Sequence, residues 1–153
     1  MSLIKYRLKR NFEKTNEPSP QNDVAKQESG NNFVVQKHAA SHLHYDFRME
    51  MQDTETKLFV LKSWAIPKNI PLSVNEKHLA IQVEDHPVDY LDFEGKIPEG
   101  NYGAGTVEIW DKGKWGLMKG GLEEGVMSFN LFGEKIKGRY SMVKTKNYGK
   151  QKI

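Results

Sequence analysis

Apolar residues recur along the chain in short runs rich in valine, isoleucine and aromatic residues, which is the pattern of β-strands. The runs lie at 33–36, 43–51, 58–61, 79–83, 106–110, 127–132 and 139–143. Turn-forming residues separate them, as at Asp111–Lys114 and Gly120–Gly121. No segment keeps a helical period of 3.6 residues over several turns. The pattern therefore predicts an all-β fold, either a barrel or a sandwich, with few short helices.

Residues 13–32 differ from the rest because nearly all of them are polar. We expect an irregular N-terminal arm over residues 1–32, followed by one β domain over residues 33–153. A chain of 153 residues is long enough for a single domain with its own core. The polar arm also helps to explain why only 37% of the residues are hydrophobic, a low fraction for a globular protein.

Several classes of protein are excluded by what the sequence lacks. No stretch approaches the roughly 20 apolar residues that a membrane-spanning helix needs, and no apolar signal-peptide core follows Met1. The sequence contains no cysteine, so any bound metal would have nitrogen and oxygen ligands. We therefore expect a cytoplasmic, monomeric protein with no membrane contact.

The formal net charge is only +3, but the basic residues gather near the two ends of the chain. They are Lys5, Arg7, Lys9, Arg10 and Lys14 at one end and Lys135, Lys137, Arg139, Lys144, Lys146, Lys150 and Lys152 at the other. Clustered basic residues fit a polyanionic partner such as nucleic acid. Basic termini are also common on proteins without such a partner, so charge alone leaves both interpretations open.

The most informative stretch runs from Leu43 to Met49, where apolar and polar residues alternate strictly. Alternate residues of a strand share a face, so His44, Asp46 and Arg48 form a row opposite the core face. Residues i and i+2 lie roughly 6.5 Å apart, which lets His44 and Asp46 reach one ion. His38, upstream of a bend, is a third ligand candidate.

Imidazole and carboxylate ligands together suit manganese, iron, zinc or nickel better than magnesium or calcium. The alternative is a hydrogen-bond network of surface side chains. His42 competes with His38 as a ligand, but a bend that aims His38 inward would aim His42 outward. Arg48 beside a metal would clamp a phosphate or carboxylate, whereas without one it would form a salt bridge with Asp46.

Three residues further along the chain are candidates for binding a phosphate. Lys62 follows an apolar run, where it is either a phosphate-binding charge or an edge residue with its amine in solvent. His86 shares strand parity with Gln82 and Glu84 and precedes Pro87, so it is placed to act as a general acid or to hold a phosphate. Tyr90 offers a hydroxyl, although a core tyrosine is the simpler interpretation.

The glycine-rich segment Pro98–Gly105 precedes a strand and not a helix. It therefore lacks the context of a phosphate-binding loop. We interpret it as a tight structural loop beside the site.

Taken together, these residues make the chain resemble the 3′-phosphoesterase domain of DNA ligase D and its stand-alone relatives. The resemblance covers most of residues 5–145, and several blocks in the same order make it far more specific than any single motif. The matching blocks are Phe33–His38, Leu43–Arg48, Leu61–Lys68, Val83–Tyr90 and Phe93–Val107.

The resemblance implies a small, closed or nearly closed β-barrel enzyme that heals DNA 3′ ends for break repair. Such enzymes use a divalent metal, most often Mn²⁺, with Co²⁺ or Zn²⁺ as other occupants, to remove a 3′-terminal ribonucleoside and then the 3′-phosphate. The implied partners are a DNA primer–template, a DNA ligase and a repair polymerase.

The resemblance also assigns roles to individual positions. His38, His44 and Asp46 match metal ligands. The resemblance also implies residues around the scissile phosphate and residues of an N-terminal arm that packs on or near the active site. They are Arg48, Lys62, His86 and Tyr90 for the phosphate, and Arg10 and Glu17 for the arm.

This sequence departs from the family pattern at three places. Asn11 stands where the family has an aspartate, and His78 stands where it has a basic residue, usually arginine. The chain also stops at Ile153, where the family continues into another apolar strand and a basic tail. These departures put the role of the arm in doubt more than the metal ligands.

Two other classes stay open at this point. One is a β-barrel that binds nucleic acid without catalysis. The other is a non-haem Fe(II) oxygenase, whose metal is also held by two histidines and an acid. The second histidine of those oxygenases usually comes much later in the chain, and they have no evident use for both Arg48 and Lys62.

Overall fold

The computed structural model describes residues 3–12, 14–15, 17–18, 30–145 and 150–153. Its elements are α1 (Leu3–Leu8), β1 (Asn32–Ala39), β2 (Leu43–Gln52), β3 (Phe59–Ile66), β4 (Leu79–His86), the 3-10 helix η1 (Val88–Asp92), β5 (Gly95–Ile97), β6 (Gly105–Gly121), the 3-10 helix η2 (Leu122–Glu124), β7 (Val126–Phe132), β8 (Lys137–Lys144) and β9 (Lys150–Lys152). The predicted all-β class with few short helices is confirmed.

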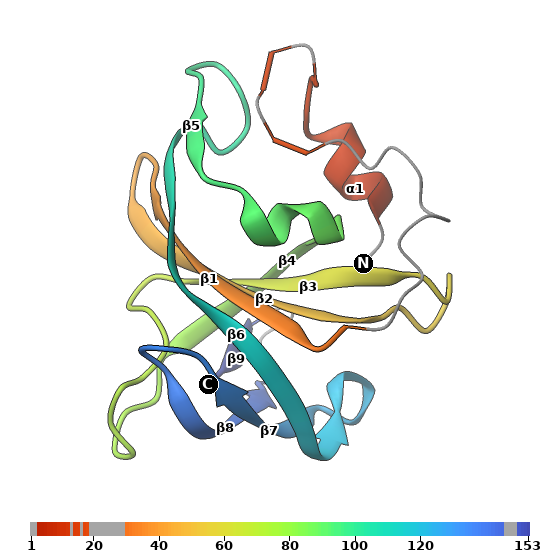
Figure 1. Ribbon diagram of the computed structural model, residues 1–153, viewed down its shortest axis with the longest axis vertical. Helices are drawn as coiled ribbons and strands as arrows, with labels where there is room; N and C mark the ends of the chain where they lie inside the picture. Colours follow the sequence, from red (N-terminus) through yellow and green to blue (C-terminus); the bar gives the residue numbers. More distant parts are fainter. Residues whose placement is uncertain (1–2, 13, 16, 19–29, 146–149) are drawn as a thin grey trace.

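The strands form one antiparallel sheet in the order β1-β2-β3-β4-β9-β8-β7-β6-β5. The long strand β6 also pairs with β1, with Thr106 opposite Ala39 and Lys114 opposite Asn32. The series of paired strands therefore returns to its start, and the sheet curls into a barrel-like shape (Figure 1). The short strand β9 links β4 to β8 in this series.

Strands β1 to β4 form a layer with two covered faces. α1, η1 and β5 lie over one face, which we call the upper face, and β7 and β8 lie on the lower side (Figure 1). Strand alternation divides the side chains: Phe33 and Val35 enter the lower core, while Val34 enters the upper one. The largest buried side chains of the lower core are Phe33, Phe47, Met49, Trp64 and Phe129, and those of the upper core are Tyr6, Leu61 and Tyr90.

A bulge in β4 changes which residues face the upper side. Ser63 of β3 pairs with Val83, but Leu61 pairs with His86, so β4 has one extra residue between the two pairs. An extra residue reverses the alternation of a strand. The prediction that Gln82 shares a face with Glu84 and His86 is therefore wrong: Glu84 and His86 line an upper cavity, and Gln82 lines a lower one.

Among the described residues of the N-terminal arm, one helix is present. Leu3–Leu8 forms α1, and the fully buried ring of Tyr6 anchors it to the upper core. Residues 19–29 and Lys146 lie outside the described residues, so the boundary between arm and barrel at residue 32 stays a prediction. Within the described ranges, no helix has the length and apolar character needed to span a membrane.

Candidate metal and phosphate site

A cavity of about 300 Å³ opens on the upper face between the sheet, the arm and the loop after β5. It collects most of the side chains predicted to form the site. They are Arg10, Glu17, His38, His44, Asp46, Arg48, His86 and Tyr90, joined by Glu84, Tyr102 and Gly103. Lys62 is absent from this lining.

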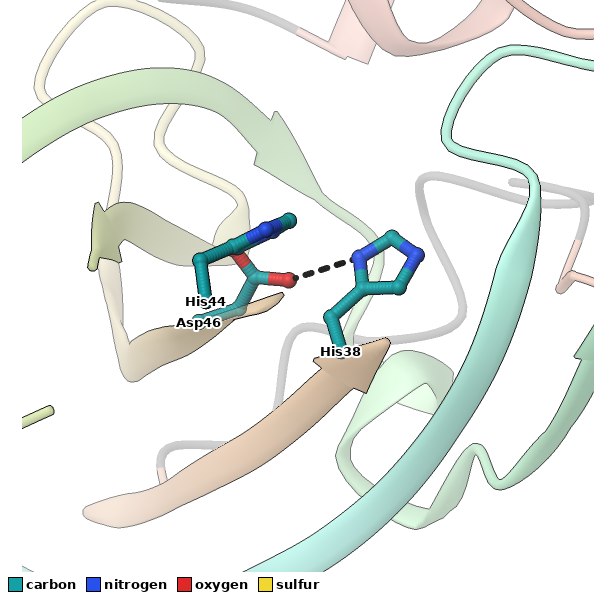
Figure 2. A group of neighbouring side chains, drawn as sticks. All are labelled: His38, His44 and Asp46. Carbon is teal, nitrogen blue, oxygen red and sulfur yellow. Dashed lines mark hydrogen bonds and ion pairs between the residues drawn. The ribbon is translucent and has the colours of Figure 1, made fainter. Parts of the chain in front are cut away.

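His38, His44 and Asp46 converge at one side of the cavity. His38 of β1 is the direct cross-strand partner of His44 of β2, and Asp46 lies two residues further along the same strand face. One ligand atom from each of the three lies within 4.8 Å of the others. The Asp46 carboxylate reaches both rings, with Oδ2 at 3.3 Å from His38 Nδ1 and Oδ1 at 3.3 Å from His44 Nε2 (Figure 2).

Backbone carbonyls fix the tautomer of each histidine. Nε2 of His38 lies 2.6 Å from the carbonyl oxygen of Gly103, and Nδ1 of His44 lies 3.1 Å from that of His42. A carbonyl can only accept, so these two nitrogens carry the protons. In the neutral rings, His38 Nδ1 and His44 Nε2 on the side of Asp46 are then the nitrogens that could hold a metal, which is the arrangement of metal-ligating histidines held from outside.

The charge on Asp46 also suits a cation. Burial alone would raise the pKa of this carboxyl, but Arg48, His38 and His44 outweigh burial and lower the pKa well below its usual range. The pKa of His44 is raised, chiefly because the protonated ring can donate from Nε2 to Asp46. Two imidazole nitrogens and one carboxylate therefore fit a divalent transition metal. His42 contributes its carbonyl to this arrangement, and its ring is outside the ligand group.

Arg48 lies next to Asp46 and is only 3% exposed. Its Nε donates to Gln36 Oε1 at 2.7 Å, its Nη2 lies 3.5 Å from Asp46 Oδ2, and its guanidinium carbon lies 4.6 Å from the centre of the Tyr90 ring. Its Nη1 has no hydrogen-bond partner among the described residues. A buried guanidinium with an unused donor is expected to bind an anion in the cavity.

Gln36 was not predicted from the sequence. Its side chain is completely buried, and its Nε2 donates to the carbonyls of Tyr90 and Phe93 at 2.9 and 3.0 Å. It thus connects Arg48 to η1. A polar residue that follows the apolar run Phe33–Val35 and shares strand parity with His38 is the signal that could have identified it.

The arm contributes Arg10 and Glu17 to the same cavity. Arg10 Nη2 lies 3.2 Å from His86 Nε2, and Arg10 Nε donates to Glu17 Oε2 at 2.8 Å. The Tyr90 hydroxyl also donates to Glu17. Glu17 therefore ties the arm to η1 and orients the Arg10 guanidinium toward His86.

His86 is neutral in this environment. Burial, followed by the charges of Arg48 and Arg10, lowers its pKa well below the usual range. Its Nδ1 lies 2.9 Å from the carbonyl of Glu84, so Nδ1 carries the proton and Nε2 accepts from Arg10. This arrangement does not favour His86 as a general acid, but it does favour a role in positioning Arg10.

Lys62 does not line the cavity, so the structure does not bring it together with the other residues predicted to lie around the scissile phosphate. Strand alternation turns it to the lower side with Trp64, while Ser63 faces the upper side. Its Nζ lies 2.9 Å from both Asp53 Oδ1 and Asp85 Oδ2. Lys62 is therefore part of a buried ionic cluster beneath His86.

The two residues that depart from the family pattern, Asn11 and His78, are not among the three metal-ligand candidates. Asn11 is exposed, and its carbonyl accepts from the backbone N–H groups of Lys14 and Thr15 in the turn after α1. His78 pairs with Glu76 and with the carbonyl of Asn69. Neither residue lines the cavity.

The chain is similar along most of its length to known proteins. The profile of the DNA ligase D 3′-phosphoesterase domain matches residues 36–144. The multifunctional non-homologous end joining protein LigD of Pseudomonas aeruginosa is 49% identical over 152 residues, which cover 97% of this chain and 17% of that protein. The LigD proteins of Mycobacterium tuberculosis and Mycolicibacterium smegmatis are 46% and 41% identical, each over 94% of this chain. The chain spans less than a fifth of the length of these relatives, 17 to 19%.

Proposed function

The chain belongs to the DNA ligase D 3′-phosphoesterase domain family, and on this premise we propose that it heals DNA 3′ ends by metal-dependent phosphoester hydrolysis. The proposed activities are removal of a 3′-terminal ribonucleoside and then of the 3′-phosphate, which leaves a 3′-hydroxyl for ligation. One observation carries the proposal. Arg48, a buried guanidinium whose Nη1 has no hydrogen-bond partner among the described residues, lines the same cavity as the converging His38, His44 and Asp46.

We propose that His38 Nδ1, His44 Nε2 and an Asp46 oxygen hold Mn²⁺, with Co²⁺ or Zn²⁺ as other possible occupants. The donor set supports this choice, because two nitrogens and one oxygen suit these ions. When bound, the ion supplies Lewis acidity toward a phosphate oxygen. Fixed tautomers lower the reorganisation that binding requires, since neither ring has to move its proton.

The protein's own residues then bind and orient the phosphate. Arg48 donates from Nη1 to a non-bridging oxygen and stabilises the charge that grows there as water attacks phosphorus and the P–O bond to the leaving group breaks. The departing oxygen takes up a proton from solvent. Arg10, held by Glu17 and His86, supplies a second guanidinium at the cavity wall. Tyr90 supports both, since its ring contacts Arg48 and its hydroxyl contacts Glu17.

The relatives' names describe multifunctional end-joining proteins. We propose that this chain serves the same process in the cytoplasm, on primer–template ends that a DNA ligase and a repair polymerase also use. Its basic residues would hold the DNA backbone without sequence preference, so binding should weaken with salt.

The test uses a primer–template with one 3′-terminal ribonucleotide, incubated with the protein in Mn²⁺ or in EDTA. We expect the primer to lose its terminal ribonucleoside and then the 3′-phosphate in Mn²⁺, with no change in EDTA. Arg48→Lys should lower kcat/KM by about 100-fold, because lysine lacks the fork of donors with which a guanidinium can bind Gln36 and a phosphate at the same time.

Lys77→Arg, at an exposed position between β3 and β4, is the matched control and should retain full activity. DNA binding by the wild-type protein without shortening of the primer in Mn²⁺ would contradict the proposal. That outcome would indicate a non-catalytic nucleic-acid-binding barrel.

A further inference from the structure

The loop between β5 and β6 carries an aromatic side chain that the proposed chemistry leaves unused. Tyr102 lines the cavity, yet it is 45% exposed, a large fraction for an aromatic residue beside a buried site. An isolated exposed tyrosine would mean little. Tyr102 stands out because of how firmly it is placed next to the proposed metal ligands.

Several contacts hold the loop in place. The carbonyl of Gly103, the next residue, accepts from His38 Nε2 at 2.6 Å. The N–H of Ala104 donates to the carbonyl of Asn101, which closes a turn around Tyr102. At Gly105 a Cβ atom would come within 2.2 Å of the Ala39 carbonyl oxygen, so only glycine allows the loop to pack this closely on β1. The position of Tyr102 is therefore fixed relative to His38.

Two cations, Arg10 and Lys9, contact the Tyr102 ring, and Arg10 is one of the residues proposed to bind the phosphate. Arg10, whose guanidinium contacts His86, has its central carbon 5.3 Å from the centre of the Tyr102 ring. Lys9 Nζ lies 4.8 Å from the ring centre and 3.4 Å from the hydroxyl, and it also pairs with the buried Glu84. A partly exposed aromatic ring in contact with guanidinium and ammonium groups is the combination that proteins use to bind single-stranded nucleic acid.

We propose that Tyr102 is a stacking platform for the nucleobase next to the scissile phosphate. A phosphate held by Arg10 and Arg48 is one sugar away from that base, so the base can reach the rim where Tyr102 lies. Stacking on an aromatic ring tolerates any base, which suits an enzyme that must accept every 3′ end. This inference rests on the proposed function, because it names the part of the substrate that the same site would grip.

The test compares three substrates: a primer with all its bases, one with an abasic terminal ribose, and one abasic at the penultimate position. Tyr102→Ala should lower kcat/KM on the complete primer by about 10-fold. On the substrate that lacks the stacked base, the wild-type and Tyr102→Ala proteins should become equal, and this identifies which of the two bases is bound. Tyr102→Phe should behave as wild type, because the ring and not the hydroxyl makes the contact.

Phe132→Ala, which removes an exposed ring of β7 outside the cavity lining, is the control and should leave kcat/KM unchanged on all three substrates. An equal loss by Tyr102→Ala on every substrate, or no loss on the complete primer, would overturn the inference.

Fluorescence anisotropy of a labelled primer–template with metal-free protein provides a second measurement. Tyr102→Ala should weaken that binding by about 10-fold even if the wild-type protein proves to have no hydrolytic activity, and undiminished binding would count against the platform.

Discussion

Arg48 and Gln36 form a buried pair in which Arg48 Nε donates to Gln36 Oε1 at 2.7 Å. The two donors on Gln36 Nε2 are used by the carbonyls of Tyr90 and Phe93, so the amide cannot rotate without losing both bonds. The guanidinium is thereby held in place at the wall of the cavity. Gln36 acts on the phosphate only through Arg48, which makes it a positioning residue.

This relationship predicts the effect of Gln36→Leu. The variant removes the acceptor of Arg48 and the side-chain donor to the carbonyls of Tyr90 and Phe93, of which the Tyr90 carbonyl still accepts from the Phe93 N–H, so unfolding should become easier by about 1–3 kcal/mol. We expect kcat/KM on a 3′-phosphate primer to fall by about 10-fold. In combination with Arg48→Lys, the two effects should be far less than additive, because both act on one guanidinium. Full additivity would show that Gln36 acts by another route.

The ionic cluster of Lys62, Asp53 and Asp85 predicts a large loss of stability in Lys62→Met. Removing the amine leaves two buried carboxylates without their shared cation, which typically costs about 3–5 kcal/mol. Thermal unfolding of Lys62→Met should therefore begin at a clearly lower temperature than that of Lys57→Met, an exposed control. Adding Asp85→Asn should restore part of the difference, and no restoration would mean that Lys62 stabilises the fold by packing alone.

The same cluster predicts how stability depends on pH. Burial alone would raise the pKa of Asp53, but hydrogen bonds from the Thr56 backbone and from Lys62 lower it to about 2. A carboxyl with a lowered pKa stabilises the fold above its unfolded pKa of roughly 4, and this contribution is lost as the pH falls toward 2. The difference in stability between wild type and Asp53→Asn should therefore be largest near neutral pH and shrink between pH 4 and 2. A difference that is constant over this range would contradict the assignment.

Strand alternation explains how much of the site the sequence could predict. The strict alternation from Leu43 to Met49 places His44, Asp46 and Arg48 on one face, and antiparallel pairing with β1 brings His38 opposite His44. The fold class follows from the same pattern, since short alternating runs cannot form long helices.

Other parts of the site depend on contacts that no local pattern contains. The bulge in β4 separates Gln82 from His86, and Lys62 lies one position out of step with the residues that face the cavity. The bond between Arg10 and His86 joins residues far apart in the sequence. The Gly103 carbonyl that orients His38 is a backbone atom, which side-chain identity does not report.

The central claim is that His38, His44 and Asp46 bind one divalent cation. The most direct measurement is a titration of each protein with Mn²⁺, followed by the electron paramagnetic resonance signal of the free ion. We expect the wild type and His42→Ala to bind one Mn²⁺ per chain, because the ring of His42 is outside the ligand group, and His44→Ala to lose that binding while remaining folded. Equal Mn²⁺ binding by His44→Ala and the wild type, or its absence from the wild type, would contradict the metal site on which the proposed chemistry depends.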